Sequence, residues 1–488
     1  MFSILIKKEL IAILQNPKFI TTFAVSSFLI ILSVLIGINE YKNNLAQYDT
    51  GISLAKSKIE ESRSWHSINA IAYRKPDPMQ IFVSGVNNDI GRFSNVSRQG
   101  EVKLQNSSYS DDPVFAIFRN IDFAFIMTIV LSLFAIMFTY NAVNGEKEDG
   151  TLRLLFSNSI SRAEFIASKV VGAWLGLVVP LLIPISISFL LIISFDINFR
   201  FFDWSRVLTL AFVSITYFTF FIIFGILVSS ITKSSSTSFL LLLTFWIITV
   251  FIIPRVGVIA AGQIIRIPSH AEIESQLDAF SKDSWKNYTT QLSKTWNERR
   301  LQMEGMSESE KAMYEDDNSW GWMQTDDKLR KINEENITDY SRKLFEGYKN
   351  NRIELRKLAL TLSRFSPASA YQLAAMNMAS TDIALKVRYE DAIQLYKEKI
   401  LSHASQKAET DGDSFGLRIS MDSEKGISVE GGRDQNMLDT SELPQFAEPS
   451  YTFAQIFEPT IIDISILFIL SIACFGLSVY RFSKFDLR

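Results

Sequence analysis

Six long apolar stretches constrain this chain more than any other feature of its 488 residues. Each has about the length of the roughly 20 helical residues that cross a bilayer. In hydrocarbon every backbone N–H and C=O must be satisfied within the segment, so we expect each stretch to be a helix. The six predicted spans are residues 19–38, 121–143, 170–195, 207–231, 236–253 and 460–480. The sequence thus predicts an all-α polytopic membrane protein with six transmembrane helices.

The short segments that flank these spans differ in charge. Lysines and arginines gather in the N-terminal segment, in the loop 144–169 and in the tail 481–488, while the opposite short loop carries Arg200 and Arg206. Positive residues mark the cytoplasmic side, so both termini are expected in the cytoplasm. The first apolar run is too long for a cleaved signal peptide and is followed by no small-residue cleavage site, so we expect it to be retained.

Two long polar segments, residues 39–120 and 262–459, then lie together on the outer face. The first combines a predicted helix over 45–65 with turn-rich sequence. The second has a charge-rich helical pattern over 270–406, with a predicted interruption near 316–321. We therefore expect a mainly helical extracytoplasmic domain.

The second outer segment ends in a stretch rich in Gly, Ser and Asp, residues 410–442. Within it, residues 416–421 and 426–430 alternate apolar and polar side chains. This pattern is typical of a small hairpin, although the sequence slightly favours a loose loop. The outer domain is thus expected to carry at most a small β element.

Composition excludes several kinds of site. Asp and Glu number 52 against 49 Lys and Arg, so the chain has no net positive field to attract nucleic acid. Cys474 is the single cysteine and three histidines are scattered, which excludes an intramolecular disulfide and a zinc site of the usual kind. The outer segments contain no serine-hydrolase motif and no zinc-protease motif. We expect no catalytic residue and no metal ligand.

The N-terminal segment 1–18 has the pattern of an amphipathic helix that breaks at Asn16 and Pro17. Its apolar residues recur at helical spacing, opposite Lys7 and Lys8. Such a helix is expected to lie in the membrane interface, with its lysines among the headgroups. It is either a plain membrane anchor or a helix that also meets a partner, and the residues alone leave both open.

The loop 144–169 is the one sizeable cytoplasmic loop that this topology leaves. Gly145 and Gly150 bracket an acidic turn, and Thr151 is the predicted cap of a short helix that begins with Leu152 and Arg153. That helix is shaped either to dock into a groove of another protein or merely to join two spans.

A second helix is expected to follow in the same loop. It would start at Ser159 or Ser161, carry Glu164 near its positive end and run into the third span.

Four segments carry a resemblance to a known family. KKELIAILQNPKF precedes the first span, and GEKEDGTLRLLFSNSISRAEFIASKVVG joins the second to the third. With six spans, these segments resemble the permease subunits of ABC-2-type (type V) bacterial ABC transporters. YRKPDPMQIFVSG and LSRFSPASAYQLAAMNMASTD resemble the branch with a large extracytoplasmic insertion of unknown function, related to permeases of nitrous-oxide-reductase maturation and gliding motility.

The resemblance implies a coupling helix that sits in a cleft of a separate ATPase subunit, flanked by an N-terminal connecting helix. It assigns the coupling role to Gly145, Glu146, Glu148, Gly150, Thr151, Leu152 and Arg153. The connecting helix would include Lys7, Lys8 and Glu9. It also implies a bacterial cytoplasmic (inner) membrane, two copies of an ATP-binding-cassette subunit, and a second permease chain that is identical or paralogous.

This chain itself is not expected to bind nucleotide. Gly145 and Gly150 have the glycine spacing of a phosphate-binding loop, but Thr151 stands where that loop requires lysine. ATP and Mg are therefore expected in the partner ATPase, and no cofactor in this chain.

Two prolines, Pro180 and Pro184, lie one turn apart in the third span, and each removes a backbone N–H and favours a kink. They are either a membrane gate or, as the sequence favours, an ordinary kink that neighbouring helices accommodate.

The leading functional hypothesis is an ABC permease that couples ATP hydrolysis in a separate subunit to export of a substrate or to mechanical work on an extracytoplasmic partner. The alternative is a membrane-anchored scaffold whose helical outer domain captures a partner without ATP. A membrane enzyme is the weakest hypothesis, because the motifs it requires are missing from the sequence.

Overall fold

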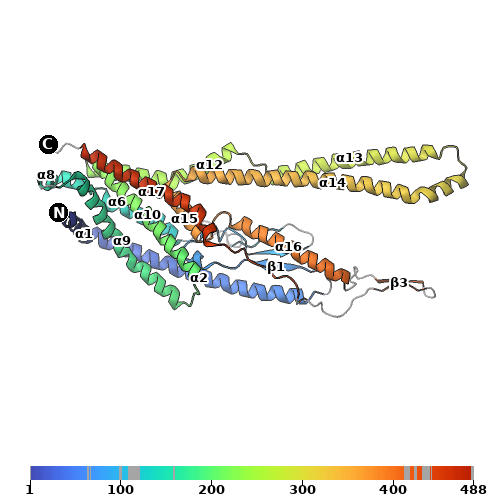
Figure 1. The fold of residues 1–488 in the computed structure, drawn as a ribbon, viewed down its shortest axis with the longest axis horizontal. Helices are drawn as coiled ribbons and strands as arrows, with labels where there is room; N and C mark the ends of the chain where they lie inside the picture. Colours follow the sequence, from blue (N-terminus) through green and yellow to red (C-terminus); the bar gives the residue numbers. More distant parts are fainter. Residues whose placement is uncertain are drawn as a thin grey trace. The chain divides into compact units, whose positions relative to one another are not determined.

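The computed structural model describes residues 2–62, 65, 68–97, 102–107, 121–157, 160–410, 418–422, 426–430, 440 and 442–484. The chain forms two compact units. The first unit consists of Met1–Ile252 and Ser366–Arg488, and the second unit of Ile253–Phe365. Figure 1 shows that long helices dominate both.

Six helical segments among the described residues are long and apolar enough to cross a membrane, which confirms the predicted number. They are Pro17–Glu60, Phe123–Glu148, Arg162–Ser194, Phe201–Ile231, Ser235–Ile264 and Phe453–Ser483. The described residues are mainly helical, so the protein is an all-α polytopic membrane protein.

Four of these segments, α2 (Pro17–Glu60), α9 (Arg162–Ser194), α10 (Phe201–Ile231) and α17 (Phe453–Ser483), are unbroken α-helices. The other two each contain a π-helical turn. The second span consists of α5 (Phe123–Phe125), the π-helix η3 (Ile126–Leu131) and α6 (Ser132–Thr139). The fifth consists of α11 (Ser235–Ile247), the π-helix η4 (Ile248–Ile252) and α12 (Ile253–Ile264).

Both π-helical turns offer a carbonyl to a side chain of a neighbouring element. The Tyr217 hydroxyl donates to the Thr128 carbonyl of η3 over 3.1 Å. The Ser366 hydroxyl donates to the Thr249 carbonyl of η4. These bonds give the two carbonyls a hydrogen-bond donor, which the hydrocarbon of a membrane interior cannot supply.

The first span is longer than predicted. The predicted span 19–38 and most of the predicted helix 45–65 form the single helix α2, whose start is capped by Asn16. A proline is absent between Pro17 and Pro76, so nothing breaks the helix at the membrane edge. Gly37 admits the short helix η2 (Pro78–Ile81), because a Cβ at Gly37 would lie 2.4 Å from the Ile81 carbonyl oxygen.

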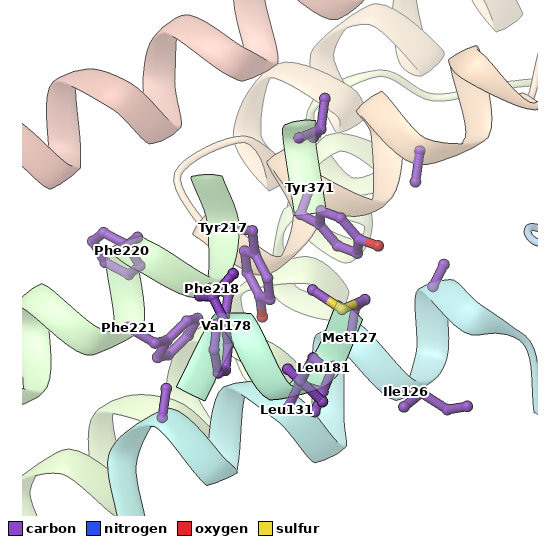
Figure 2. Close-up of a cluster of buried hydrophobic side chains, with 14 of the residues drawn as sticks. Ile126, Met127, Leu131, Val178, Leu181, Tyr217, Phe218, Phe220, Phe221 and Tyr371 are labelled. Atoms are coloured by element: carbon purple, nitrogen blue, oxygen red, sulfur yellow. The ribbon is translucent and has the colours of Figure 1, made fainter. Parts of the chain in front are cut away.

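A short helix from the second outer segment lies among the membrane spans. α15 (Pro367–Met378) packs against α10, α17 and both π-helical turns, and Tyr371 stacks on Tyr217 with ring centroids 4.7 Å apart (Figure 2). Tyr217 is next to the middle residue of the spanning helix Phe201–Ile231, so α15 reaches about halfway along this span.

Outside the spans, the first unit has a second apolar core around a small antiparallel ribbon. Strands β1 (Ala70–Tyr73) and β2 (Phe93–Val96) pair with Ala70 opposite Val96. The helix α16 (Leu385–Thr410) contributes Ile393 to the same core. The sequence did not predict this ribbon, because strands of four residues give too little alternation to recognise.

A second hairpin is formed where the sequence slightly favoured a loop. β3 (Arg418–Asp422) pairs antiparallel with β4 (Gly426–Glu430). The residues between them, 423–425, lie outside the described part of the chain.

The second unit contains α12 and a long antiparallel hairpin of α13 (His270–Gln302) and α14 (Glu308–Ser363) (Figure 1). The predicted interruption near residues 316–321 is wrong, because these residues continue α14. The helix breaks instead just before Ser307. There Gly305 adopts φ 97°, and Ser307 caps α14 together with Glu310.

Arg206, near the N-terminal end of α10, joins three parts of the first unit. Its buried guanidinium donates to both carboxylate oxygens of Asp77 (3.1 and 2.9 Å) and to Asp203 (3.2 Å). It also donates to the Met378 carbonyl (2.7 Å) and to the Ser380 hydroxyl (3.0 Å). The two outer segments that carry the family resemblance therefore meet at one arginine.

Candidate functional site

The loop after the second span folds into two short helices, α7 (Asn144–Glu148) and α8 (Thr151–Phe156). Gly150 separates them with φ 72°, a left-handed conformation that favours glycine. Gly150, rather than the predicted Thr151, is therefore the cap residue of α8, and Thr151 is its first helical residue. The second helix of the loop begins at Ser161, which forms a capping box with Glu164; Ser159 lies outside the described residues.

A cluster of four charged side chains joins this loop to two other helices; we call Lys8, Glu9, Glu146 and Lys169 the ionic cluster. Glu146 of α7 accepts from Lys8 over 2.8 Å and from Lys169 of α9 over 2.7 Å. Lys169 also donates to Glu9 over 2.7 Å. The side chain of Lys169 is 4% exposed and that of Glu146 is 11% exposed, so the central pair is shielded from water.

Helix α1 (Phe2–Leu14) reaches this cluster because two glycines of α9 allow close approach. A Cβ at Gly172 would lie 2.5 Å from the Glu9 Cβ, and one at Gly176 would lie 3.3 Å from Ile13. Small residues four apart permit such backbone contact between membrane helices. Lys7 lies on the exposed face of α1 and takes no part in the ionic cluster.

The expected interfacial position of α1 is compatible with this packing. One face, with Leu5 and Ile13, is buried in the chain, while Phe2, Ile4 and Ile11 remain exposed. The exposed apolar face suits the boundary of the hydrocarbon layer. Helix α1 therefore contacts α9 and still offers a surface to lipid.

The turn between α10 and α11, residues 229–235, holds α7 from another side. The Asn144 side chain donates to the Thr232 hydroxyl over 2.7 Å, and its backbone N–H donates to the Ser229 hydroxyl over 3.1 Å. Glu148 accepts from the Ser235 backbone N–H (2.8 Å) and hydroxyl (2.7 Å). These two bonds tie the end of α7 to the start of α11.

Comparison with known proteins gives the chain its family. A sequence model described as ABC-2 family transporter protein matches residues 3–487, nearly the whole chain. The chain belongs to the ABC-2 transporter family. A search of curated proteins found no match. The family makes this protein a permease, the multi-pass membrane subunit of an ABC transporter, which associates with an ATPase subunit and is not itself the catalytic component.

The two faces of α8 in the permease have different environments. Leu152 is 4% exposed and belongs to the main hydrophobic core. It therefore anchors α8 to the rest of the chain and is not accessible to a partner protein. Leu154 is 71% exposed, and Arg153 and Thr151 are exposed beside it. Phe156 packs on Phe482 of α17, with centroids 5.8 Å apart. The surface open to a partner is therefore Thr151, Arg153 and Leu154.

The structure places the two prolines of the permease away from the ionic cluster, in an unbroken α9. Pro184 is buried and Pro180 is half-buried. Leu181 and Leu182, between them in sequence, line an apolar cavity of about 190 Å³ that α9 forms with α2, the second span and α10. The prolines thus lie beside an intramembrane space, and their role as a gate stays a prediction.

Sequence reasoning missed several residues that hold the site together. Lys169 was placed at the end of the loop without a role, although it is the most buried cation of the ionic cluster. Ser229 and Ser235 belong to a polar run, SSITKSSS, between two apolar spans, and this run was the one sequence signal that could have indicated them. The contacts themselves depend on tertiary packing and have no local pattern.

Proposed function

We propose that this permease couples ATP hydrolysis by a separate ATP-binding-cassette subunit to export of a substrate, through α7 and α8. The observation that supports the proposal is the ionic cluster, in which Glu146 of α7 binds Lys169 of α9 and Lys8 of α1. Force applied to the exposed face of α8 would reach α9 and α1 through buried charges, which resist separation.

The proposal includes an arrangement of the whole transporter. The loop with α7 and α8 and both termini face the cytoplasm, and the outer segments face away from it, as the distribution of Lys and Arg favours. Two permease chains, identical or paralogous, bind two copies of the ATPase in a bacterial cytoplasmic membrane. ATP and Mg are bound by the ATPase.

The test changes the exposed face of α8 and leaves its anchor intact. Arg153→Glu with Leu154→Asp should abolish recovery of the ATPase with the permease, because it places two acidic groups on a surface that must be covered. The matched control is Leu395→Asp, an exposed leucine of α16 in an outer segment. Undiminished recovery with the double variant, at normal membrane insertion, would remove the coupling role of α8.

A second function, mechanical work on an extracytoplasmic partner, is favoured by the end of the α13–α14 hairpin. Large apolar side chains are exposed near the turn that joins the two helices: Trp296, Leu301, Met313, Trp320 and Met323. Large apolar side chains exposed close together along a helix pair are typical of interaction surfaces. The partner itself stays a proposal.

The two functions differ in whether nucleotide moves this hairpin. Spin labels on Trp320→Cys in a Cys474→Ser background would report the distance between the hairpins of two permease chains. Mechanical work predicts a distance distribution that shifts when ATP is added to the complex. An unchanged distribution, together with sustained ATP hydrolysis, would favour export alone.

A further inference from the structure

A pocket of about 470 Å³, lined by both polar and apolar residues, lies in the first unit, between α2 and the β1–β2 ribbon. Asn44, Gln47, Gly51 and Leu54 form the α2 wall at helical spacing. Asn44 is about 9 Å beyond residue 38, the predicted end of the first span, at 1.5 Å per residue. Headgroup layers are about 5–8 Å deep, so the pocket starts close to the outer surface of the bilayer. Its volume is in the range of small-molecule sites.

Two arginines line this pocket at the end of the ribbon. Arg74 follows Tyr73 of β1 and Arg92 precedes Phe93 of β2, so they lie opposite each other just beyond the Tyr73–Phe93 pair, and the Arg74 backbone N–H donates to the Arg92 carbonyl over 2.8 Å. Like charges at neighbouring cross-strand positions oppose strand pairing. Among the described residues that line the pocket, none is acidic. An anion bound between the two guanidiniums would relieve this repulsion.

Two carboxylates close to the pocket, Glu40 and Glu448, lie outside its lining and accept hydrogen bonds there. Glu40 accepts from Asn88 over 2.6 Å and lies near Arg92, and Glu448 accepts from the Tyr48 hydroxyl over 3.0 Å. Burial and the neighbouring Arg92 lower the pKa of Arg74 to about 10, so Arg74 stays protonated at neutral pH. No described carboxylate forms an ion pair with Arg74. Its guanidinium instead donates to the Asn87 side chain (2.6 Å) and carbonyl (2.9 Å).

The pocket also has hydrogen-bond donors to spare. Gln80 is 5% exposed, and its side-chain N–H₂ group has no acceptor among the described residues. The buried Arg74 Nε–H likewise has no acceptor among the described residues, and the Asn44 amide also lines the pocket. These donors suit a group with more acceptor oxygens than the two of a carboxylate. A phosphate has more acceptor oxygens and matches the planar fork of arginine.

We propose that this pocket binds a phosphate-bearing group, supplied either by an anionic lipid headgroup at the outer leaflet or by a soluble phosphate compound. This inference does not rest on ATPase coupling, because the site lies wholly within the permease chain.

The experiment uses the purified full-length chain in neutral detergent and follows thermal unfolding at constant ionic strength. One series adds inorganic phosphate, with acetate for comparison. The other adds phosphatidylglycerol to the micelles, with an uncharged glycolipid for comparison. A saturable rise in Tm with either phosphate probe, larger than with its comparison, is expected. A response to phosphatidylglycerol alone identifies the lipid as the source, and a response to both identifies phosphate itself.

Two substitutions test whether the response comes from this pocket. Arg92→Gln removes one guanidinium and should weaken the apparent affinity tenfold or more. Ala46→Trp, on an exposed position of the α2 wall, should block the pocket without disturbing the ribbon. The controls are Asn43→Trp, on α2 but outside the lining, and Arg266→Gln, an exposed arginine of the second unit. No saturable response to either probe, or a response that survives both substitutions, overturns the proposal.

Discussion

At the scale of single residues, Lys169 is the cation on which the ionic cluster depends most. It is buried between Glu9 and Glu146, so Lys169→Met leaves two carboxylates that only the half-exposed Lys8 can compensate. Breaking a buried ion pair costs about 3–5 kcal/mol, so the variant should have a lowered Tm and lose ATPase stimulation by the permease. Lys7→Met, at the exposed lysine directly before Lys8, should change neither.

A double-mutant cycle separates the charge pair from general damage. Lys169→Met combined with Glu146→Gln removes both partners, so part of the lost stability should return. Additive losses would show that the two residues do not act as a pair.

A corresponding prediction concerns Arg206 at the N-terminal end of α10. Arg206→Lys keeps the charge but loses the planar fork that reaches Asp77, Met378 and Ser380 at once. The carbonyl and hydroxyl left unpaired should destabilise the outer part of the first unit by about 1–3 kcal/mol each. Hydrogen exchange in α15 should rise, and normal protection there would contradict the role given to Arg206.

At the scale of elements, the contact between α1 and α9 depends on the absence of a side chain. Gly172→Val places atoms where Glu9 now lies, so α1 should be displaced and ATPase recovery should fall. Gly476→Val in α17 is the matched control, because no heavy atom lies within 4 Å of a Cβ there. Equal effects of the two valines would indicate a nonspecific response of membrane helices to bulk.

An ion pair between Arg299 of α13 and Asp326 of α14 should make the stability of this hairpin depend on pH. Hydrogen bonds from Arg299 lower the pKa of the Asp326 carboxyl. The Arg299–Asp326 ion pair contributes about 1 kcal/mol to the stability of the hairpin. This contribution is fully present above the pKa of an unfolded Asp, near 3.9, and is lost as the pH falls through the lowered pKa of Asp326. Hydrogen exchange corrected for the intrinsic rate should show the hairpin loosening on acidification. Asp326→Asn should loosen it already at pH 7, whereas Asp316→Asn should not.

Long apolar helices were predictable from the sequence, whereas elements that depend on contacts between residues far apart in the chain were not. The six spans are visible because about 20 apolar residues have one structural solution in a bilayer. The α14 break was misplaced because Asp316–Gly321 looks turn-like, although exposed polar residues can continue a helix and the positive φ of Gly305 decides the turn. α15 gave a signal that was overlooked: residues 366–381 contain no charge.

For the candidate site, the sequence indicated which segment forms the site but not which face of α8 is exposed. Gly145–Arg153 was identified by resemblance, whereas the inward position of Leu152 and the outward position of Leu154 follow from packing on the membrane core. A six-residue helix is too short for its apolar face to be assigned from periodicity.

At the scale of the whole molecule, the proposed function requires one asymmetry. It requires that the exposed face of α8 meets the ATPase in the cytoplasm and that the turn of the α13–α14 hairpin is exposed on the opposite side of the membrane. Single cysteines at Leu154 and Ser307, in a Cys474→Ser background, sample the two places. Both side chains are exposed, so Leu154→Cys removes no buried contact, and Ser307→Cys changes only the side chain that caps α14.

Chemical cross-linking of these two variants in intact transporter is the most direct measurement. We predict that Leu154→Cys forms a cross-link to the ATPase subunit and that Ser307→Cys forms none. A cross-link from residue 307, or its absence from residue 154 in a complex that still hydrolyses ATP, would contradict the assignment of α8 as the coupling helix.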